Sequence, residues 1–170
     1  SKEETLKLIR TIRSKIPGGS IRTTFIVGFP GETDKDFQEL LDFLRQTKFE
    51  RAGVFVYSRE EGTAAYHFPH QVPENIKKER LDILMKEQKK ISCTVQGKFL
   101  GQKLDVLIEE RQKGKEDIYL GRSEFDAPDV DGLVYVHSQK TLKPGDFVSV
   151  EITEAFEYDL SGELTSESSQ

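Results

Sequence analysis

The first half of the chain alternates between helical and strand-like hydrophobic patterns. Apolar positions recur at helical spacing over residues 3–16, and Pro17-Gly18-Gly19 ends that pattern. Residues 21–28 and 52–57 are apolar and rich in β-branched side chains, which predicts two strands. Between them, Thr33 is a suitable N-cap for a helix with one apolar stripe. Strand, helix and strand in this order predict a parallel βαβ unit whose strands are buried on both faces.

A long helix and then several short strands complete the pattern. Pro73 suits the first turn of a helix, whose apolar positions recur until Gly97 or Gly101 ends it. After Gly101 the hydrophobic period becomes that of strands, and turn residues separate the apolar runs. These runs are 104–108, 118–120, 133–136 and 147–152. Short strands at such spacing predict a small antiparallel barrel.

The change of pattern divides the chain into three expected parts. Residues 1–97 form an α/β part with the long connecting helix, residues 98–160 form the barrel, and residues 161–170 are a Ser/Glu-rich, disordered tail. Charge follows the same division. Residues 1–97 hold 17 basic and 14 acidic side chains, a net charge of +3, whereas residues 98–160 hold 8 and 14, a net charge of −6. The acidic part is expected to repel phosphate backbones and to attract basic partners.

Composition excludes some classes of protein. No apolar run approaches the roughly 18 residues of a membrane span, so we expect no membrane contact. Cys93 is the only cysteine, which rules out a disulfide within the chain and fits a reducing, cytoplasmic location. The chain opens at Ser1 without methionine, and two strands cannot close an α/β sheet. We therefore expect a piece of a longer protein, whose truncated sheet edge could also pair with a second copy as a homodimer.

Three segments carry a resemblance to a known family. Gly28-Phe29-Pro30-Gly31-Glu32-Thr33 lies between a strand and a helix, and residues 54–63, Val-Phe-Val-Tyr-Ser-Arg-Glu-Glu-Gly-Thr, cover the next strand and loop. Gly121-Arg122-Ser123 and the acidic run of residues 126–132 lie in the expected barrel. In this order and spacing they resemble the radical S-adenosylmethionine (SAM) methylthiotransferases. The third segment resembles the TRAM domain of the RimO-type subgroup, which modifies a protein rather than tRNA.

The resemblance implies a fold and a reaction. The fold is the C-terminal part of a partial α/β barrel followed by a small antiparallel TRAM β-barrel of OB-like type. The reaction uses SAM and two 4Fe–4S clusters to place a methylthio group on the β-carbon of an aspartate in a small-subunit ribosomal protein. One cysteine cannot supply three cluster thiolates. We therefore expect the cluster ligands upstream of Ser1, no catalytic or metal-binding residue in this chain, and no activity of the chain alone.

The resemblance also implies two sets of site residues. SAM is expected at the turn and the second strand, because glycines in the turn let the backbone approach a ligand closely. An ordinary tight connection between a strand and a capped helix would show the same sequence pattern. These residues are Gly28, Phe29, Gly31, Glu32, Val54, Phe55, Val56 and Tyr57. The TRAM domain is expected to recognise a basic ribosomal protein through Arg122, Asp126, Asp129 and Asp131, unless the acidic loop is only a solvated turn.

Other candidates are expected to be structural, and two other functions stay open. His67 and His70 are expected in a solvated loop, and Cys93 as a packing residue or partly exposed thiol. Lys77 and Lys78 are expected on a solvated helix face or on a face that docks an anionic surface. The first alternative function is a tRNA-adenosine methylthiotransferase. The second is a non-catalytic module that binds nucleic acid or protein.

Overall fold

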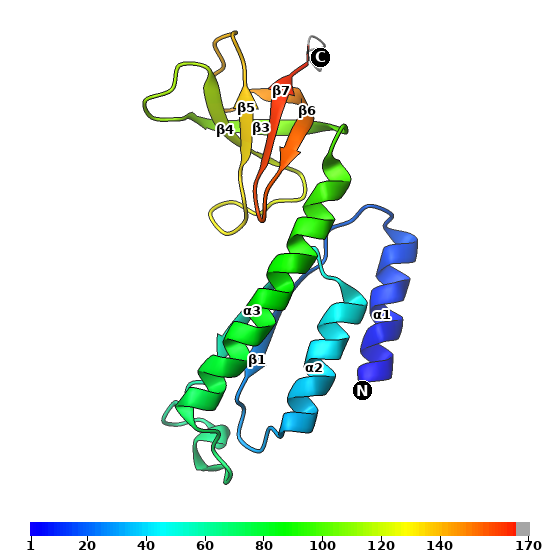
Figure 1. The fold of residues 1–170 in the computed structure, drawn as a ribbon, viewed down its shortest axis with the longest axis vertical. Coiled ribbons are helices and arrows are strands. Elements are labelled where there is room, and N and C mark those ends of the chain that lie inside the picture. Colours follow the sequence, from blue (N-terminus) through cyan, green and yellow to red (C-terminus); the bar gives the residue numbers. More distant parts are fainter. Residues whose placement is uncertain (166–170) are drawn as a thin grey trace. The chain divides into compact units, whose positions relative to one another are not determined.

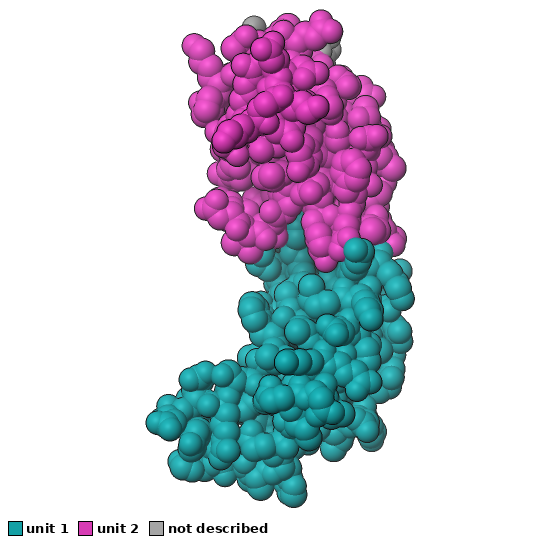
Figure 2. Space-filling model, turned by 60° about the vertical axis from the view of Figure 1, so that its left-hand side comes forward, with its two compact units in different colours: residues 1–91 teal, residues 92–170 magenta. Residues whose placement is uncertain are grey.

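The computed structural model describes residues 1–165, which fall into two compact units, Ser1–Ile91 and Ser92–Gln170 (Figure 2). The helix α3, Glu74–Gln96, contributes residues to both units, so the boundary lies inside a helix. As expected, this helix ends just before Gly97. The domain limits expected from the sequence, 1–97 and 98–160, stay predictions.

Unit 1 contains the βαβ arrangement expected from the sequence (Figure 1). Its elements are α1 Lys2–Lys15, β1 Arg22–Val27, α2 Asp34–Thr47, β2 Arg51–Val56, a short 3₁₀ helix η1 Ala64–His67, and the first part of α3. The two strands pair in parallel, with Arg22 opposite Arg51 and Val27 opposite Val56. The parallel pair confirms the reading of strand, crossover helix and strand.

The two-stranded sheet is covered on one face only. Val27 and Val54 are buried, as are Leu44 of α2 and Leu84 of α3. On the opposite face Ile26 and Phe55, which are register partners, are 56% and 63% exposed. The expectation that both faces are buried is therefore wrong for the described residues. The composition of the strands matches a sheet covered on both faces, but within the described part of the chain nothing covers this side.

The start of α2 is fixed by a reciprocal cap. The Thr33 hydroxyl accepts the Asp36 N–H at 3.2 Å, and the Asp36 carboxylate accepts the Thr33 N–H at 2.9 Å. The Thr33 hydroxyl also donates to this carboxylate at 2.6 Å. These hydrogen bonds satisfy backbone donors that an uncapped helix leaves unpaired. The N-cap predicted at Thr33 is thus confirmed.

Unit 2 is a closed five-stranded barrel. The strands are β3 Lys103–Arg111, β4 Ile118–Ser123, β5 Val134–His137, β6 Phe147–Ala155 and β7 Leu160–Leu164, preceded by the 3₁₀ helix η2 Gly97–Phe99. They close in the order β3-β4-β5-β7-β6. All neighbours are antiparallel except β5 and β7, which run parallel. Inward-facing side chains such as Ile108, Val136 and Ile152 form its core. The fold class expected from the sequence, an α/β part followed by a small β-barrel, is confirmed.

The last strand corrects one expectation. Residues 161–164 belong to β7, which pairs with β5 and β6, so this part of the expected disordered tail is wrong. Composition concealed the strand because its buried positions include Ser161 and Gly162 rather than large apolar residues. A Cβ atom on Gly162 would lie 2.3 Å from the Glu151 carbonyl oxygen, so a small residue is required there. Residues 166–170 of the expected tail lie outside the described residues.

Within residues 1–165 no helix combines the length and the hydropathy needed to cross a bilayer.

The cap of α2 predicts a pH effect. Hydrogen bonds from the Thr33 hydroxyl and then the Thr33 N–H lower the pKa of Asp36 below its ordinary value of 3.8. Because the folded pKa is lowered, the stabilisation is present above the ordinary pKa and is lost as pH falls through the lowered one. Thr33→Val should raise the pKa of Asp36, whereas Thr33→Ser should keep it low. Carboxyl carbon NMR titration measures this, and coinciding curves for Thr33→Val and wild type would contradict it.

The barrel core predicts a stability effect. Ile152 is 1% exposed, so Ile152→Ala should lower the unfolding free energy of unit 2 by about 2–5 kcal/mol. Ile83→Ala is the matched control, because Ile83 is 37% exposed and its loss should change stability by only about 0.5 kcal/mol. Urea unfolding followed through the amide signals of each unit gives both values. Equal effects of the two changes would show that Ile152 does not support the barrel.

Candidate functional site

The turn of residues 28–33, which links β1 to α2, lies where the sequence predicted a ligand site. Gly28 has a φ of +76°, and a Cβ atom there would lie 2.3 Å from Cγ of Lys77. Gly31 has a φ of +88°, and a Cβ atom there would meet nothing within 4 Å. Glycine is therefore required at position 28 by both conformation and space. At position 31 the backbone faces open space that a ligand can approach.

Glu32 is committed to the turn itself. Its Oε1 accepts the Gly28 N–H at 3.0 Å and an Nη1–H of Arg80 at 2.6 Å. The other guanidinium nitrogen of Arg80 donates to Asp34 at 2.7 Å. The side chains of Glu32 and Arg80 are only 13% and 6% exposed. A buried ion pair of this kind is favourable only when additional hydrogen bonds satisfy it, as they do here. One carboxylate oxygen of Glu32 thus holds the turn in place, and its predicted role in cofactor binding stays a prediction.

Lys77 lies beneath the same turn. Its ammonium group donates to the Tyr57 carbonyl at 3.1 Å and to Glu74 at 2.6 Å, and it lies 5.3 Å from the centre of the Tyr57 ring. Lys77 is 3% exposed, so the expected solvated face is wrong for this residue. The reason is helical spacing. Lys77, Arg80 and Leu84 share one face of α3, and the polar start of that face packs on the turn while its apolar continuation enters the core.

Aromatic rings line the carboxyl ends of the two strands. The Phe29 ring makes edge contacts with Tyr57, at a centroid distance of 5.2 Å, and with Phe68, at 6.1 Å. Tyr57 is buried, and its hydroxyl has no hydrogen-bond partner among the described residues. Phe29 is 44% exposed. A buried hydroxyl without a partner beside an exposed ring makes this end of the sheet a candidate binding surface.

The outer edge of β2 adds backbone groups to this surface. The Arg51 N–H donates to the carbonyl of Ile21, just before β1, at 3.3 Å, and the Tyr57 N–H donates to the carbonyl of Val27, at the end of β1, at 2.8 Å. Because successive residues of a parallel strand direct their backbone groups to opposite sides, those of Val54 and Val56 point away from β1. Within the described residues the sheet has no third strand to receive them. The structure thus brings together the turn residues and the β2 residues predicted from the sequence. The Phe55 side chain lies apart from the core, on the exposed face.

The loop after β2 supports the turn but forms no metal site. The Gly31 N–H donates to the His70 carbonyl at 2.9 Å, so the loop contributes a backbone group rather than an imidazole. Cys93 is exposed on α3. No cluster of three or more His, Cys, Asp or Glu side chains suited to a metal occurs within residues 1–165.

The acidic loop of unit 2 is more ordered than the sequence indicated. Asp126 is 8% exposed and accepts a hydrogen bond from the Ser123 hydroxyl at 2.6 Å. Asp131 accepts the Ala127 N–H at 2.7 Å, and Arg122 pairs with Glu109 at 2.7 Å. Asp129 is exposed, with a φ of +60°. The reading of this loop as simply exposed is therefore wrong for Asp126, because its carboxylate ties the loop to the end of β4.

Comparison with known proteins gives the class of the barrel. Residues 100–165 match the family model described as a TRAM domain. Unit 2 therefore contains a TRAM domain, as the third sequence segment predicted.

Relatives that share one name match nearly the whole chain. The chain is similar to proteins named "Ribosomal protein uS12 methylthiotransferase RimO" from Desulforamulus reducens and Pelotomaculum thermopropionicum. It is 50% identical to the first over 164 residues and 53% identical to the second over 163 residues, 96% of this chain and 37% of the relative in both cases. The relative of the same name from Clostridioides difficile is 48% identical over 96% of this chain and 36% of its own length. These matches agree with the resemblance to the RimO-type methylthiotransferases predicted from the sequence. The chain spans a little over a third of the length of these relatives.

Sequence reasoning missed Lys77 and Arg80. Lys77 was expected on a solvated face or on a face that docks an anionic surface, and Arg80 was not singled out, because hydropathy alone does not register a cation that packs on a turn. The signal available was their spacing, since they share the buried face with Leu84 and Gln88.

The ion pair at the turn predicts a large effect on stability. Arg80→Met leaves the Glu32 carboxylate buried without its cation, so the unfolding free energy of unit 1 should fall by about 3–5 kcal/mol. Adding Glu32→Gln should recover part of this loss, because no charge then remains buried. Arg45→Met is the control, since Arg45 is 48% exposed and pairs with Glu87, and an exposed pair contributes about 0–1 kcal/mol. Urea unfolding measures the unfolding free energy of each variant. Equal decreases for Arg80→Met and Arg45→Met would contradict the role of Arg80.

Proposed function

We propose that the chain is part of a radical SAM methylthiotransferase that places a methylthio group on the β-carbon of an aspartate in ribosomal protein uS12. The observation that carries the proposal is the match to proteins of that name over 96% of the chain at about 50% identity. In this view unit 1 contributes part of the SAM site and the TRAM domain recognises the protein substrate. The protein would act in the cytoplasm, where ribosomal proteins are accessible.

The end of the sheet fits a contribution to SAM binding. Gly31 faces open space, the backbone groups of Val54 and Val56 point away from β1, and Phe29 offers an exposed ring. Backbone donors and acceptors suit the edge of an adenine ring, and an aromatic side chain suits its face. We assign the binding role to Gly31, Phe29 and the backbone groups of Val54 and Val56. The backbone groups of Phe55 and Tyr57 face β1, and the Tyr57 carbonyl accepts a hydrogen bond from Lys77, so Tyr57 contributes its ring beside Phe29. Gly28 and Glu32 shape the turn. SAM, when bound, supplies the radical and methyl chemistry of the reaction.

The residues present do not fit the two 4Fe–4S clusters. Cys93 is the only cysteine of the chain and is exposed, and residues 1–165 hold no alternative group of metal ligands. Cluster binding needs several thiolates held close together. We therefore assign the cluster ligands to the remainder of the full-length protein and derive no step of the reaction through them here.

The charge of the TRAM domain supports a basic protein as substrate. Residues 98–160 carry a net charge of −6, with 8 basic and 14 acidic side chains. Nucleic acid is bound mainly through basic side chains on phosphates, of which this domain has few. Among the four residues proposed for recognition, Asp129 is the most accessible, whereas Asp126, Asp131 and Arg122 also shape the loop and the barrel wall.

A homodimer is compatible with the same structure. Among the described residues neither outer strand edge of the two-stranded sheet is paired, so either could add a strand from a second copy. Cross-linking across β1 in the chain 1–170 tests this separately from the activity.

Mass spectrometry of the products tests the proposed function. The full-length protein, reconstituted anaerobically with iron and sulfide and supplied with SAM and a sulfur source, should add one methylthio group to an aspartate of uS12. Replacing that aspartate by asparagine in uS12 is the control and should abolish the added mass. Adenosine modification in tRNA, with uS12 unchanged, would overturn the proposal in favour of the tRNA-modifying subgroup.

A further inference from the structure

A cavity of about 370 Å³ opens on the outer wall of the barrel, and none of the acidic loop residues discussed above lines it. It is lined by Ile118, Tyr135, His137, Glu154, Phe156, Asp159 and Ser161. Strand register explains why these residues meet. His137 is the partner of Ile118, Tyr135 is the partner of Ser161, and Ser161 is also the partner of Glu154. The cavity therefore crosses β4, β5, β7 and β6 over two adjacent rows of register partners.

The lining combines aromatic surface with negative charge. On β5 the side chains of Val134 and Val136 point into the core, so Tyr135 and His137 point outward. Phe156 is 49% exposed, and Ser161, at the floor, is 3% exposed and bonded to His137 at 3.2 Å. Two carboxylates, those of Glu154 and Asp159, share the cavity. It thus offers rings and anionic oxygens together.

The two carboxylates differ in the hydrogen bonds that they make within the chain. Asp159 Oδ1 accepts the Leu133 N–H at 2.8 Å, which holds this residue in place. Glu154 is exposed, and within residues 1–165 its side chain makes no hydrogen bond or ion pair. An acidic group beside aromatic rings, with no internal partner, suits a cationic ligand.

We propose that this cavity binds an arginine side chain of a basic protein. A planar guanidinium stacks on aromatic rings and donates two hydrogen bonds to one carboxylate, which matches Tyr135, Phe156 and Glu154 better than a compact ammonium does. RNA does not fit, because two carboxylates at the cavity repel phosphate. The proposal rests on the proposed function, in that the basic protein is the methylthiotransferase's ribosomal substrate.

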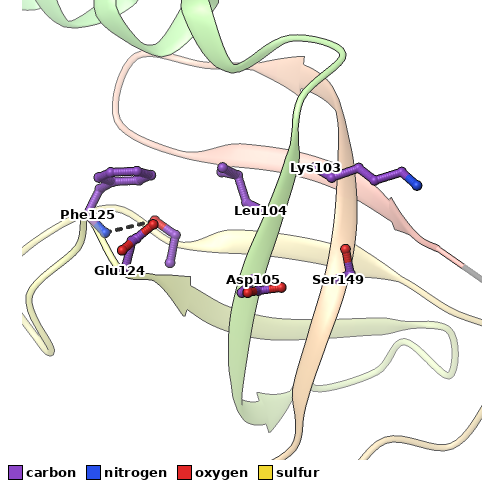
Figure 3. Close-up of a pocket in the computed structure, with 7 residues that line it drawn as sticks. Lys103, Leu104, Asp105, Glu124, Phe125 and Ser149 are labelled. Atoms are coloured by element: carbon purple, nitrogen blue, oxygen red, sulfur yellow. Dashed lines mark hydrogen bonds between the residues drawn. The ribbon is translucent and has the colours of Figure 1, made fainter. Parts of the chain in front are cut away.

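A second cavity on the barrel has a different lining and serves as a comparison for the first. It measures about 220 Å³ and is lined by Lys103, Leu104, Asp105, Ser123, Glu124, Phe125 and Ser149 (Figure 3). Here a lysine accompanies the two carboxylates, and Phe125 is the only aromatic residue. Glu124 is exposed, as Glu154 is, so Glu124→Gln removes the same charge from the same barrel at a different cavity. It is the matched control for Glu154→Gln.

The first arm of the experiment uses a small probe. Isotope-labelled chain 1–170 is titrated with a blocked Gly-Arg-Gly peptide and, as a control, with the same peptide carrying neutral citrulline. The arginine peptide should shift the amide signals of Tyr135, His137 and Ser161, and the citrulline peptide should bind roughly five- to tenfold more weakly. Equal binding of both peptides, or shifts confined to other residues, would overturn the subsite.

The second arm uses ribosomal protein uS12 and a tRNA at one ionic strength. Glu154→Gln and Phe156→Leu should each weaken binding of uS12 roughly three- to tenfold, whereas Glu124→Gln should leave it within about twofold. Equal weakening by Glu154→Gln and Glu124→Gln would overturn the subsite but not the proposed function. Failure of the wild-type chain to bind uS12 while the arginine peptide still binds would count against the proposed recognition role alone. Binding of tRNA at this cavity would overturn the arginine proposal.

Discussion

The Glu32 carboxylate connects the turn after β1 to α3 in unit 1. One oxygen accepts both the Gly28 N–H and the Arg80 guanidinium, so the turn and the helix are positioned by the same atom. Lys77 completes the arrangement, because its stem occupies the space that a side chain at Gly28 would need and its ammonium group reaches the carbonyl at the end of β2. A ligand surface at the end of the sheet therefore depends on charges buried beneath it.

The same arrangement shows what the sequence could and could not predict. Gly28, Gly31 and Thr33 were identifiable because their chemistry is local, as a positive φ and a helix cap each involve a few neighbouring residues. The parallel pairing of β1 and β2 followed from the order of the elements. Arg80 was not identifiable from local pattern, since its partner Glu32 lies 48 residues away in the chain. Burial of a charge is a property of tertiary packing, and a single sequence shows it only as an ordinary helical cation.

Unit 2 divides its acidic residues between two tasks. Asp126 and Asp131 hold the loop between β4 and β5, whereas Glu154 and Asp129 face solvent. Net charge alone could not separate these groups, because it counts structural and accessible carboxylates equally. The aromatic cavity was missed for a related reason, since its residues come from four strands and become neighbours only through the strand register.

The position of β7 between β5 and β6 has a consequence for synthesis of the protein. Until residues 160–164 have left the ribosome, β5 and β6 each present an unpaired edge, although β3, β4 and β6 can already form antiparallel pairs. Open strand edges favour pairing with other chains. The nascent barrel thus remains an open sheet through most of its translation. The insertion of β7 between β5 and β6 comes last. A ribosome that stalls shortly before Leu160 would release an aggregation-prone chain with nearly the whole domain already made.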